Sequence, residues 1–202
     1  MRTPTPIVLL IAAILFAGGC GTSGGDNASD TSTSSSTSTS TSTTTTTVAT
    51  IEVEEWAATF CGNFGTWLDG IQAASTAVGS QVTAGDFASA QTAISGLFGT
   101  ASEVTGVLIT EIEAGGAPDI DDGEGLVDDL VDRFGQFVSA ADQAKADTDA
   151  LEVDPATFEA DAKELTDRFS AEVESVGESF DQIDADYASA DLNAALTKEC
   201  AF

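Results

Sequence analysis

Residues 53–80 read VEEWAATFCGNFGTWLDGIQAASTAVGS, and this stretch decides the fold class of the chain. Large apolar side chains return every three or four residues along it, which places them on one face of an α-helix. Gly79 and Ser80 then interrupt the pattern, as expected at the end of a helix. The stretch therefore predicts a long amphipathic helix whose apolar face other parts of the chain cover. The apolar positions are Val53, Trp56, Phe60, Phe64, Trp67, Ile71, Ala74 and Val78.

Three further stretches repeat this spacing, and short links separate them. We expect helices over residues 87–112, 120–141 and 155–187, followed by a short helical tail over 191–200. Four amphipathic helices of similar length with short links predict an antiparallel up-down-up-down four-helix bundle. The expected fold class is therefore all-α, with one domain over residues 51–202 that is long enough to bury a core.

The links between the expected helices carry start and stop signals. Thr83 and Asp86 offer a start for the second helix, and residues 115–118 (GGAP) are a clear stop after it. Residues 154–155 (DP) open the fourth helix as a cap followed by a proline at the first helical position. The segment 104–112 (VTGVLITEI) has strand-like propensity, but we expect a helix because the apolar spacing continues through it.

Four phenylalanines occupy corresponding positions in the four expected helices, near the middle of each. The midpoints of antiparallel helices meet, so we expect the four rings to form one central layer. A glycine follows three of them and costs about 1 kcal/mol relative to alanine inside a helix, so we expect close backbone approach there. The rings are Phe64, Phe98, Phe134 and Phe169, and the glycines are Gly65, Gly99 and Gly135.

Ahead of the helical domain, residues 1–19 are typical of a bacterial export signal. Arg2 is the only charge before the apolar run 7–17, which is shorter than the ~20 residues that span a bilayer. Two glycines then precede Cys20, as at a lipoprotein cleavage site. We therefore expect cleavage before Cys20 and lipidation of its thiol, which would anchor the protein on the extracytoplasmic face of the cell membrane. An ordinary secretory signal with an incidental cysteine is the alternative.

Residues 20–50 are expected to form a disordered tether between the lipid and the domain. Within them, residues 31–47 are an uninterrupted run of serine and threonine. Such a segment buries too little apolar surface to offset the entropy lost on ordering. Glycosylation of its hydroxyl groups is a further hypothesis, because hydroxyl-rich stalks of secreted proteins are frequent acceptors.

The charge of the chain excludes several classes of partner. It has 34 acidic residues, 6 basic residues and no histidine, for a net charge of −28. Nucleic-acid binding needs the opposite sign, and anionic lipid headgroups are repelled as well. The lipid on Cys20 is therefore the expected membrane contact. We expect a monomer with an envelope protein as candidate partner, although solubility alone is the simpler interpretation of the acidity.

Cys61 and Cys200 are the other cysteines of the chain, and we expect them to form a disulfide. One lies near the start of the first helix and the other near the chain end, which the expected topology brings to the same pole. Export to an oxidising compartment favours the bond, which would close a loop of about 140 residues worth at most roughly 5 kcal/mol. Two free thiols are the alternative, since a redox pair lacks a Cys-x-x-Cys motif and a neighbouring basic residue.

The residue types that build common catalytic and cofactor sites are missing from the chain. Without histidine there is no base for a nucleophilic triad, no Glu-x-x-His pair for a di-iron centre and no histidine-based zinc site. A pair of carboxylates acting as in glycosidases stays open on composition alone, but a narrow bundle offers no broad cleft. We therefore expect no cofactor and no enzymatic activity.

One acidic cluster follows the stop at residues 115–118 and opens the third expected helix. Oxygen ligands in such loops bind Ca²⁺, but the spacing is not that of an EF-hand and the closing glutamate is missing. Acidic side chains in the first turn of a helix also stabilise it, by ~0.3–1 kcal/mol each, and we favour this interpretation. The cluster comprises Asp119, Asp121, Asp122, Glu124, Asp128 and Asp129.

The layout of the chain resembles the small helical lipoproteins of actinobacterial envelopes. The resemblance rests on the signal that ends at Cys20, the Ser/Thr stalk, residues 56–61 (WAATFC), residues 154–155 and the near-terminal Cys200. It implies a compartment and a fold but no mechanism. We expect a lipid-anchored binding or structural module of the envelope. The alternatives are a carrier of a small apolar or cationic ligand, which a cavity among the phenylalanines would favour, and an enzyme with a carboxylate-lined hollow.

Overall fold

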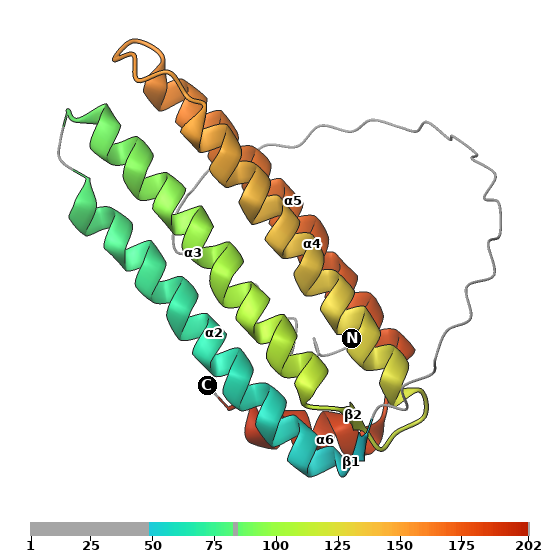
Figure 1. The fold of residues 1–202 in the computed structure, drawn as a ribbon. Coiled ribbons are helices and arrows are strands. Elements are labelled where there is room, and N and C mark those ends of the chain that lie inside the picture. Colours follow the sequence, from blue (N-terminus) through green and yellow to red (C-terminus); the bar gives the residue numbers. More distant parts are fainter. Residues whose placement is uncertain (1–48, 83–84, 202) are drawn as a thin grey trace, which may run out of the picture.

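The computed structural model describes residues 49–82 and 85–201, and helices make up most of them (Figure 1). The expected all-α class is confirmed. The elements in chain order are β1 (Thr50–Ile51), α2 (Val53–Gln81), α3 (Phe87–Ala114), β2 (Ala117–Pro118), α4 (Gly123–Asp149), α5 (Phe158–Asp186) and α6 (Ala190–Glu199).

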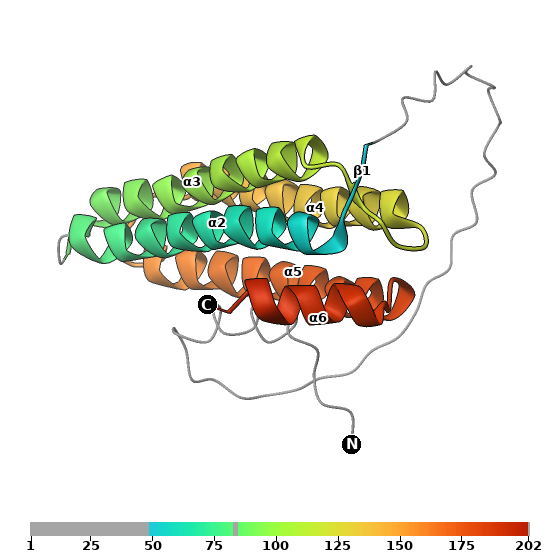
Figure 2. The same ribbon diagram turned by 90° about the horizontal axis from the view of Figure 1, so that it is seen from below.

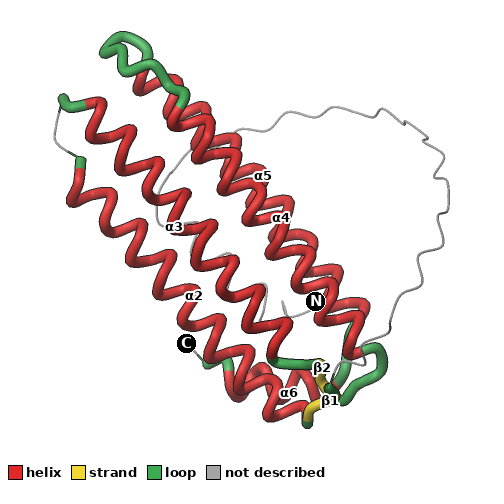
Figure 3. The backbone as a smooth tube through the Cα atoms, viewed as in Figure 1, coloured by secondary structure: helices red, strands yellow, loops and turns green. Residues whose placement is uncertain are grey.

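The four long helices α2 to α5 lie side by side, and consecutive ones pack against each other (Figures 1 and 2). Their links lie alternately at the two ends of the molecule (Figure 3). We call the end with β1, β2 and α6 the closed end. The opposite end, where α2 ends and α3 begins and where residues 150–157 link α4 to α5, is the distal end. The short helix α6 packs along α2 at the closed end.

Capping groups confirm one of the expected helix starts and correct another. Asp86 caps α3 as predicted, because its carboxylate accepts a hydrogen bond from the amide of Ser89 at 3.1 Å. The predicted cap at Asp154 is wrong, since α5 begins only at Phe158. The Asp154 carboxylate instead accepts the Ala156 amide at 2.8 Å and forms a separate turn ahead of the helix.

The third helix was expected from Ile120, but α4 begins at Gly123. A turn comes first, in which the amide of Ile120 donates to the Pro118 carbonyl at 2.9 Å and the amide of Gly123 donates to the Ile120 carbonyl at 3.3 Å. This turn requires glycine at position 123, because a Cβ there would overlap the carbonyl oxygen of Pro118. Asp122 adopts a left-handed conformation, with a φ angle of 57°, at the end of this turn. The segment 104–112, with its strand-like propensity, lies within α3 and is helical as predicted.

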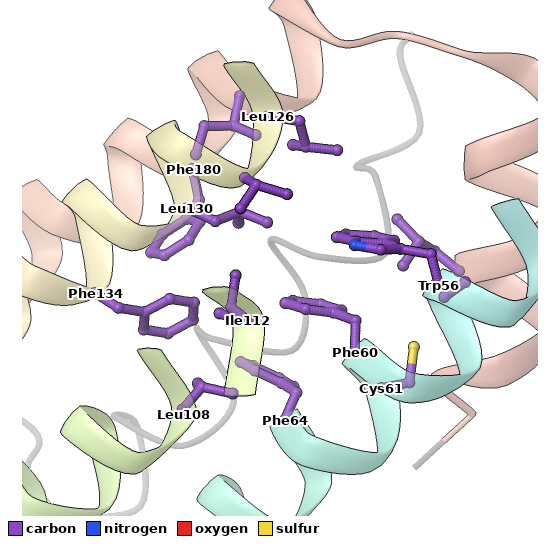
Figure 4. Packing of buried hydrophobic residues seen from close by; sticks show 14 of the residues in the cluster. Trp56, Phe60, Cys61, Phe64, Leu108, Ile112, Leu126, Leu130, Phe134 and Phe180 are labelled. Atoms are coloured by element: carbon purple, nitrogen blue, oxygen red, sulfur yellow. The ribbon is translucent and has the colours of Figure 1, made fainter. Parts of the chain in front are cut away.

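The main hydrophobic core lies toward the closed end. Trp56, Phe60 and Phe64 stack along α2, with ring centroids 5.2 and 5.8 Å apart. Figure 4 shows these rings pointing at side chains of the other long helices, including Leu108, Ile112, Leu126, Leu130, Phe134 and Phe180. A separate, smaller cluster toward the distal end contains Phe98, Ala144 and Leu165. The core is therefore divided along the length of the helices.

The predicted single layer of four phenylalanines is wrong. The ring centroids of Phe64 and Phe134 lie 6.3 Å apart in the main core. Those of Phe98 and Phe169 lie 4.7 Å apart in the smaller cluster. Each ring sits a few residues before the midpoint of a helix of 27 to 29 residues. Because α2 and α4 run opposite to α3 and α5 (Figure 1), a shift of ~1.5 Å per residue moves the two pairs apart.

The close backbone approach expected at the glycines is also wrong at two positions. A Cβ built on Gly135 would meet nothing within 4 Å, and one on Gly99 would meet only carbons of the Lys145 side chain, at 3.4 Å. The tight contact between helices lies elsewhere, at Gly70 of α2, where a Cβ would come within 3.1 Å of a Val104 methyl group. Glycine after a large ring was therefore a poor indicator of helix proximity.

Candidate functional site at the closed end

The chain enters the helical domain at the closed end, and backbone pairing fixes the entry point. The amide of Ala117 donates to the carbonyl of Ala49 at 3.0 Å, and the amide of Asp119 donates to that of Ile51 at 2.8 Å. These bonds make β1 and β2 a short parallel pair. A Cβ on Gly116, whose φ angle is 73°, would lie 2.5 Å from the Ala49 carbonyl oxygen, so this pairing requires glycine there.

Trp56 joins this entry segment to the core. Its indole nitrogen Nε1 donates a buried hydrogen bond to the carbonyl oxygen of Gly116 at 3.0 Å, while its ring stacks on Phe60. A buried indole N–H needs such a partner, because an unsatisfied one costs about 1–3 kcal/mol. The tryptophan therefore couples the α3–α4 link to the first turn of α2.

The same end is closed covalently. Cys61 of α2 and Cys200, directly after α6, form a disulfide with their Cα atoms 5.0 Å apart. Cys61 is 1% exposed. Helix α6 covers the core with Leu192, Ala195 and Leu196, all of which are buried. Both termini of the described chain are thus held at one end of the molecule, one by backbone pairing and the other by a covalent bond.

A small void lies beneath α6, between α2, α4 and α5. Its volume is about 20 Å³, and Trp56, Phe60, Leu130 and Phe180 are among its lining side chains. A cavity of this size holds roughly one water molecule, far less than the ~300–1,000 Å³ of a small-molecule site. The filled aromatic core therefore opposes the carrier interpretation.

Tyr187, at the end of α5, packs beside this void and contacts α4. Its hydroxyl donates to the carboxylate of Asp129 at 2.9 Å. Burial, followed by the hydrogen bond and the charge of Asp129, raises the pKa of Tyr187 to about 12. The phenol is therefore neutral and acts as a hydrogen-bond donor between the two helices.

The acidic side chains of the α3–α4 link are not gathered around a common point, as the ligands of a cation would be. Asp119, Asp121 and Asp122 lie exposed in the turn before α4, and Asp129 is engaged by Tyr187. Over residues 49–82 and 85–201, no group of three or more His, Cys, Asp or Glu side chains is arranged to hold a metal. Only Glu124 lies in the first turn of α4, so the expected role in helix initiation narrows to this residue.

A second acidic feature is an open hollow beside the chain entry. Glu52, Glu55 and Asp119 line it together with Thr50 and Ile51. The two glutamates are exposed, and the hollow lacks the apolar walls that exclude water from a ligand or catalytic pocket. This hollow provides no support for a carboxylate-based enzyme.

A polar cluster at the distal end escaped the sequence analysis. The hydroxyl of Ser95 and the ammonium group of Lys145 donate to opposite oxygens of Asp149, at 2.5 and 2.6 Å. Lys145 and then Ser95 lower the pKa of Asp149. Gln91 adds hydrogen bonds of 2.9 Å to the carbonyls of Thr148 and Leu151. A carboxylate with a lowered pKa is a poor base for Ser95, so the cluster ties α3 to α4 without activating a nucleophile.

The remaining predicted features lie outside the described residues. Cys20, the export signal and the tether up to residue 48 belong to this part, and their assignments stay predictions. Among the residues that the structure describes, α3 is long and apolar enough to cross a membrane, by length and composition alone. Helix α3 nevertheless packs between α2 and α4 and buries Phe98, Leu108 and Ile112.

Comparisons with protein-family models, with curated proteins and with solved structures give no match. The interpretation of the closed end therefore rests on its own residues. Two of the three cysteines singled out in the sequence meet there. The strand pair, the bond from Trp56 and the position of α6 depend on contacts between residues far apart in the chain. No local sequence pattern indicated them.

Proposed function

We propose that the protein is a lipid-anchored, extracytoplasmic binding or structural module of the bacterial cell envelope. In this proposal the helices form an up-down-up-down bundle whose tethered end is closed by α6. The observation that carries it is the Cys61–Cys200 disulfide at the end where the tether enters. Structural disulfides persist in oxidising compartments and are rare in the cytosol, so the bond supports export.

The position of the bond also suits a tethered protein. A tether from Cys20 would join the domain at β1, next to the Trp56 hydrogen bond and at the same end as the disulfide. The distal end would then point away from the membrane, at a distance set by helices of about 28 residues, or ~40 Å. The net charge of −28 favours solubility and attracts basic partners.

Two alternatives lose support. A carrier would need a cavity among the aromatic side chains, and the void there holds roughly one water molecule. An envelope enzyme would need convergent carboxylates in a hollow that excludes water, whereas the hollow at Glu52 and Glu55 is open and these side chains are exposed. We therefore retain the binding or structural module alone.

The experiment is metabolic labelling with a clickable fatty acid, combined with membrane fractionation, on the wild type and Cys20→Ala. The proposal expects the label and the membrane association to be lost in Cys20→Ala. A matched control, Cys61→Ala with Cys200→Ala, removes both other cysteines and should keep the label. Retention of both the label and the membrane fraction by Cys20→Ala would refute the anchor.

A further inference from the structure

The apolar stripe of α2 changes character along the helix. In its first half Trp56, Phe60, Phe64 and Trp67 are buried, together with Ala57 and Cys61. The stripe continues at helical spacing beyond Trp67, but none of the later residues of α2 is fully buried. We call these later positions the α2 stripe. They are Leu68, Ile71, Ala74 and Val78, which are half-buried, and Val82, which is 40% exposed.

The partner helices of α2 explain the change. Of the helices that the structure describes, α3 and α6 pack closely along α2, and α6 lies beside its first half (Figure 2). Helix α5 contacts α3 instead at the distal end. The ring centroid of Phe158 in α5 lies 5.4 Å from that of Phe87 in α3. The ring centroid of Phe169 in α5 lies 4.7 Å from that of Phe98 in α3. Leu68 and Ile71, at the start of the α2 stripe, still contact the edge of the main core. Beyond them the stripe is flanked by α3, and neither α5 nor α6 packs closely on it.

We propose that the α2 stripe is the docking site for a basic amphipathic helix of a partner protein, lying along α2 in continuation of α6. Helix α6 shows how this surface is covered, since it presents Leu192, Ala195 and Leu196, at i, i+3 and i+4, to the first half of α2. Helices bind to apolar helix faces through this spacing. The second half of α2 offers ~20 Å, which is three to four helical turns.

The charge around the stripe selects a basic occupant. Helix α2 carries Asp69 in this region and no basic residue at all. The chain has a net charge of −28, and helix α5, which begins at the same end of the molecule, has Glu159 and Asp161 in its first turn. Its basic residues are already paired, Lys163 with Asp167 at 2.5 Å and Arg168 with Asp147 at 3.4 Å. An acidic helix would be repelled, whereas lysine or arginine on the flanks of the occupant would meet unlike charge.

The inference rests on the proposed function in one respect, because a docking face is what a binding module requires. The two are tested separately. Binding is measured in solution by fluorescence anisotropy with the full chain as the cell makes it, whatever its lipidation. The probe is a labelled 14-residue peptide with leucines at i, i+3, i+4 and i+7 and lysines elsewhere, about the length of the stripe. A second peptide replaces each lysine by glutamate.

The discriminating variant is Val78→Ser with Val82→Ser, which changes half-buried and exposed side chains and spares the core. It should bind the lysine peptide about tenfold more weakly than the wild type, or ~1.4 kcal/mol. Val107→Ser is the matched control, since Val107 is 57% exposed on α3, and it should bind as the wild type does. Ala74→Lys, which adds a like charge to the stripe, should also weaken binding.

Four outcomes would overturn the proposal. Equal binding by the double variant and the wild type would mean adsorption by charge alone. Equal loss in Val107→Ser would place the contact on α3. No binding of the lysine peptide to the wild type at millimolar concentration, or equal binding of the glutamate peptide, would mean that the stripe does not select a basic helix. None of these results depends on whether Cys20 carries a lipid.

Discussion

The closed end and the distal end of this protein are built from the same four helices but are held together differently. At the closed end, aromatic rings from α2, α4 and α5 form one cluster under α6, and a disulfide and the β1–β2 pair hold both ends of the described part of the chain. At the distal end, the helices are joined by a small cluster around Phe98 and a polar network at Asp149. The apolar spacing of α2 is continuous across both.

The difference shows that periodicity determines which face of a helix is apolar, whereas the neighbours determine how much of that face is buried. Trp67 is 7% exposed, and Ile71, one turn further along the same stripe, is only half-buried. The change coincides with the end of the cover from α6, and no other helix packs closely on α2 there besides α3, among the residues that the structure describes. In the proposal, the closed end therefore supplies stability and the distal end supplies the binding surface.

The largest effect is expected from removing the disulfide. Cys61→Ser with Cys200→Ser opens a loop whose ends are 139 residues apart, and chain-entropy models put the loss at up to roughly 5 kcal/mol. Urea unfolding measures the change, and amide exchange in α6 should accelerate more than in the middle of α4. An unchanged unfolding midpoint would show that the bond does not stabilise the closed end.

Truncating one ring at each end sharpens the comparison. Phe134→Ala should cost about 3–5 kcal/mol, because this ring is 2% exposed and contacts Phe64, Trp67 and Phe180. Phe169→Ala should cost less, since Phe169 is only half-buried. Chemical denaturation of both variants checks the order. A larger loss of stability in Phe169→Ala than in Phe134→Ala would contradict the position of the main core at the closed end.

A buried hydrogen bond provides a smaller test. The indole nitrogen of Trp67 donates to the hydroxyl of Thr105 at 2.8 Å, and Thr105 is fully buried. Thr105→Val keeps the volume but leaves the indole N–H without its acceptor, so a loss of about 1–3 kcal/mol is expected. Thr148→Val is the control at the distal end, because that hydroxyl donates to the Ala144 carbonyl of its own helix. Equal losses of stability in the two variants would mean that the hydrogen bond between Trp67 and Thr105 adds nothing to the stability.

The smallest effects concern the pH dependence of the free energy of unfolding, which should fall at acid pH because of the distal end and at alkaline pH because of the closed end. The lowered pKa of Asp149 means that its contribution is present above about 3.8 and is lost as the pH falls below that value. The raised pKa of Tyr187, about 12 against 10.0, means that its contribution is present below pH 10 and is lost between 10 and 12. The free energy of unfolding is measured as a function of pH. The contribution that is lost at acid pH should be missing in Asp149→Asn, and the contribution that is lost at alkaline pH should be missing in Tyr187→Phe.

The apolar spacing was sufficient to predict the helices and the all-α class, and the cap at Asp86 was correct. The register between helices was not predictable from equal Phe spacing, because rings placed before the helix midpoints separate when neighbouring helices run in opposite directions. The turn before α4 depends on contact between Gly123 and Pro118, which only the folded chain reveals.

The site was predictable to a smaller extent. The meeting of Cys61 and Cys200 could be expected from the topology and the compartment, because few cysteines were available. The bonds from Trp56 to Gly116 and from Ser95 to Asp149 could not, since their partners are more than 50 residues apart in the chain. Such contacts carry no local pattern that composition or periodicity would reveal.

Native-state hydrogen exchange along α2 tests the central claim most directly, because one helix passes through both ends. The account predicts that amides from Trp56 to Trp67 exchange only through global unfolding, whereas those from Ile71 to Gln81 exchange through smaller, local openings. The lysine peptide should slow exchange in the second group alone. Uniform protection along the whole of α2, unchanged by the peptide, would contradict the division into a locked end and a docking end.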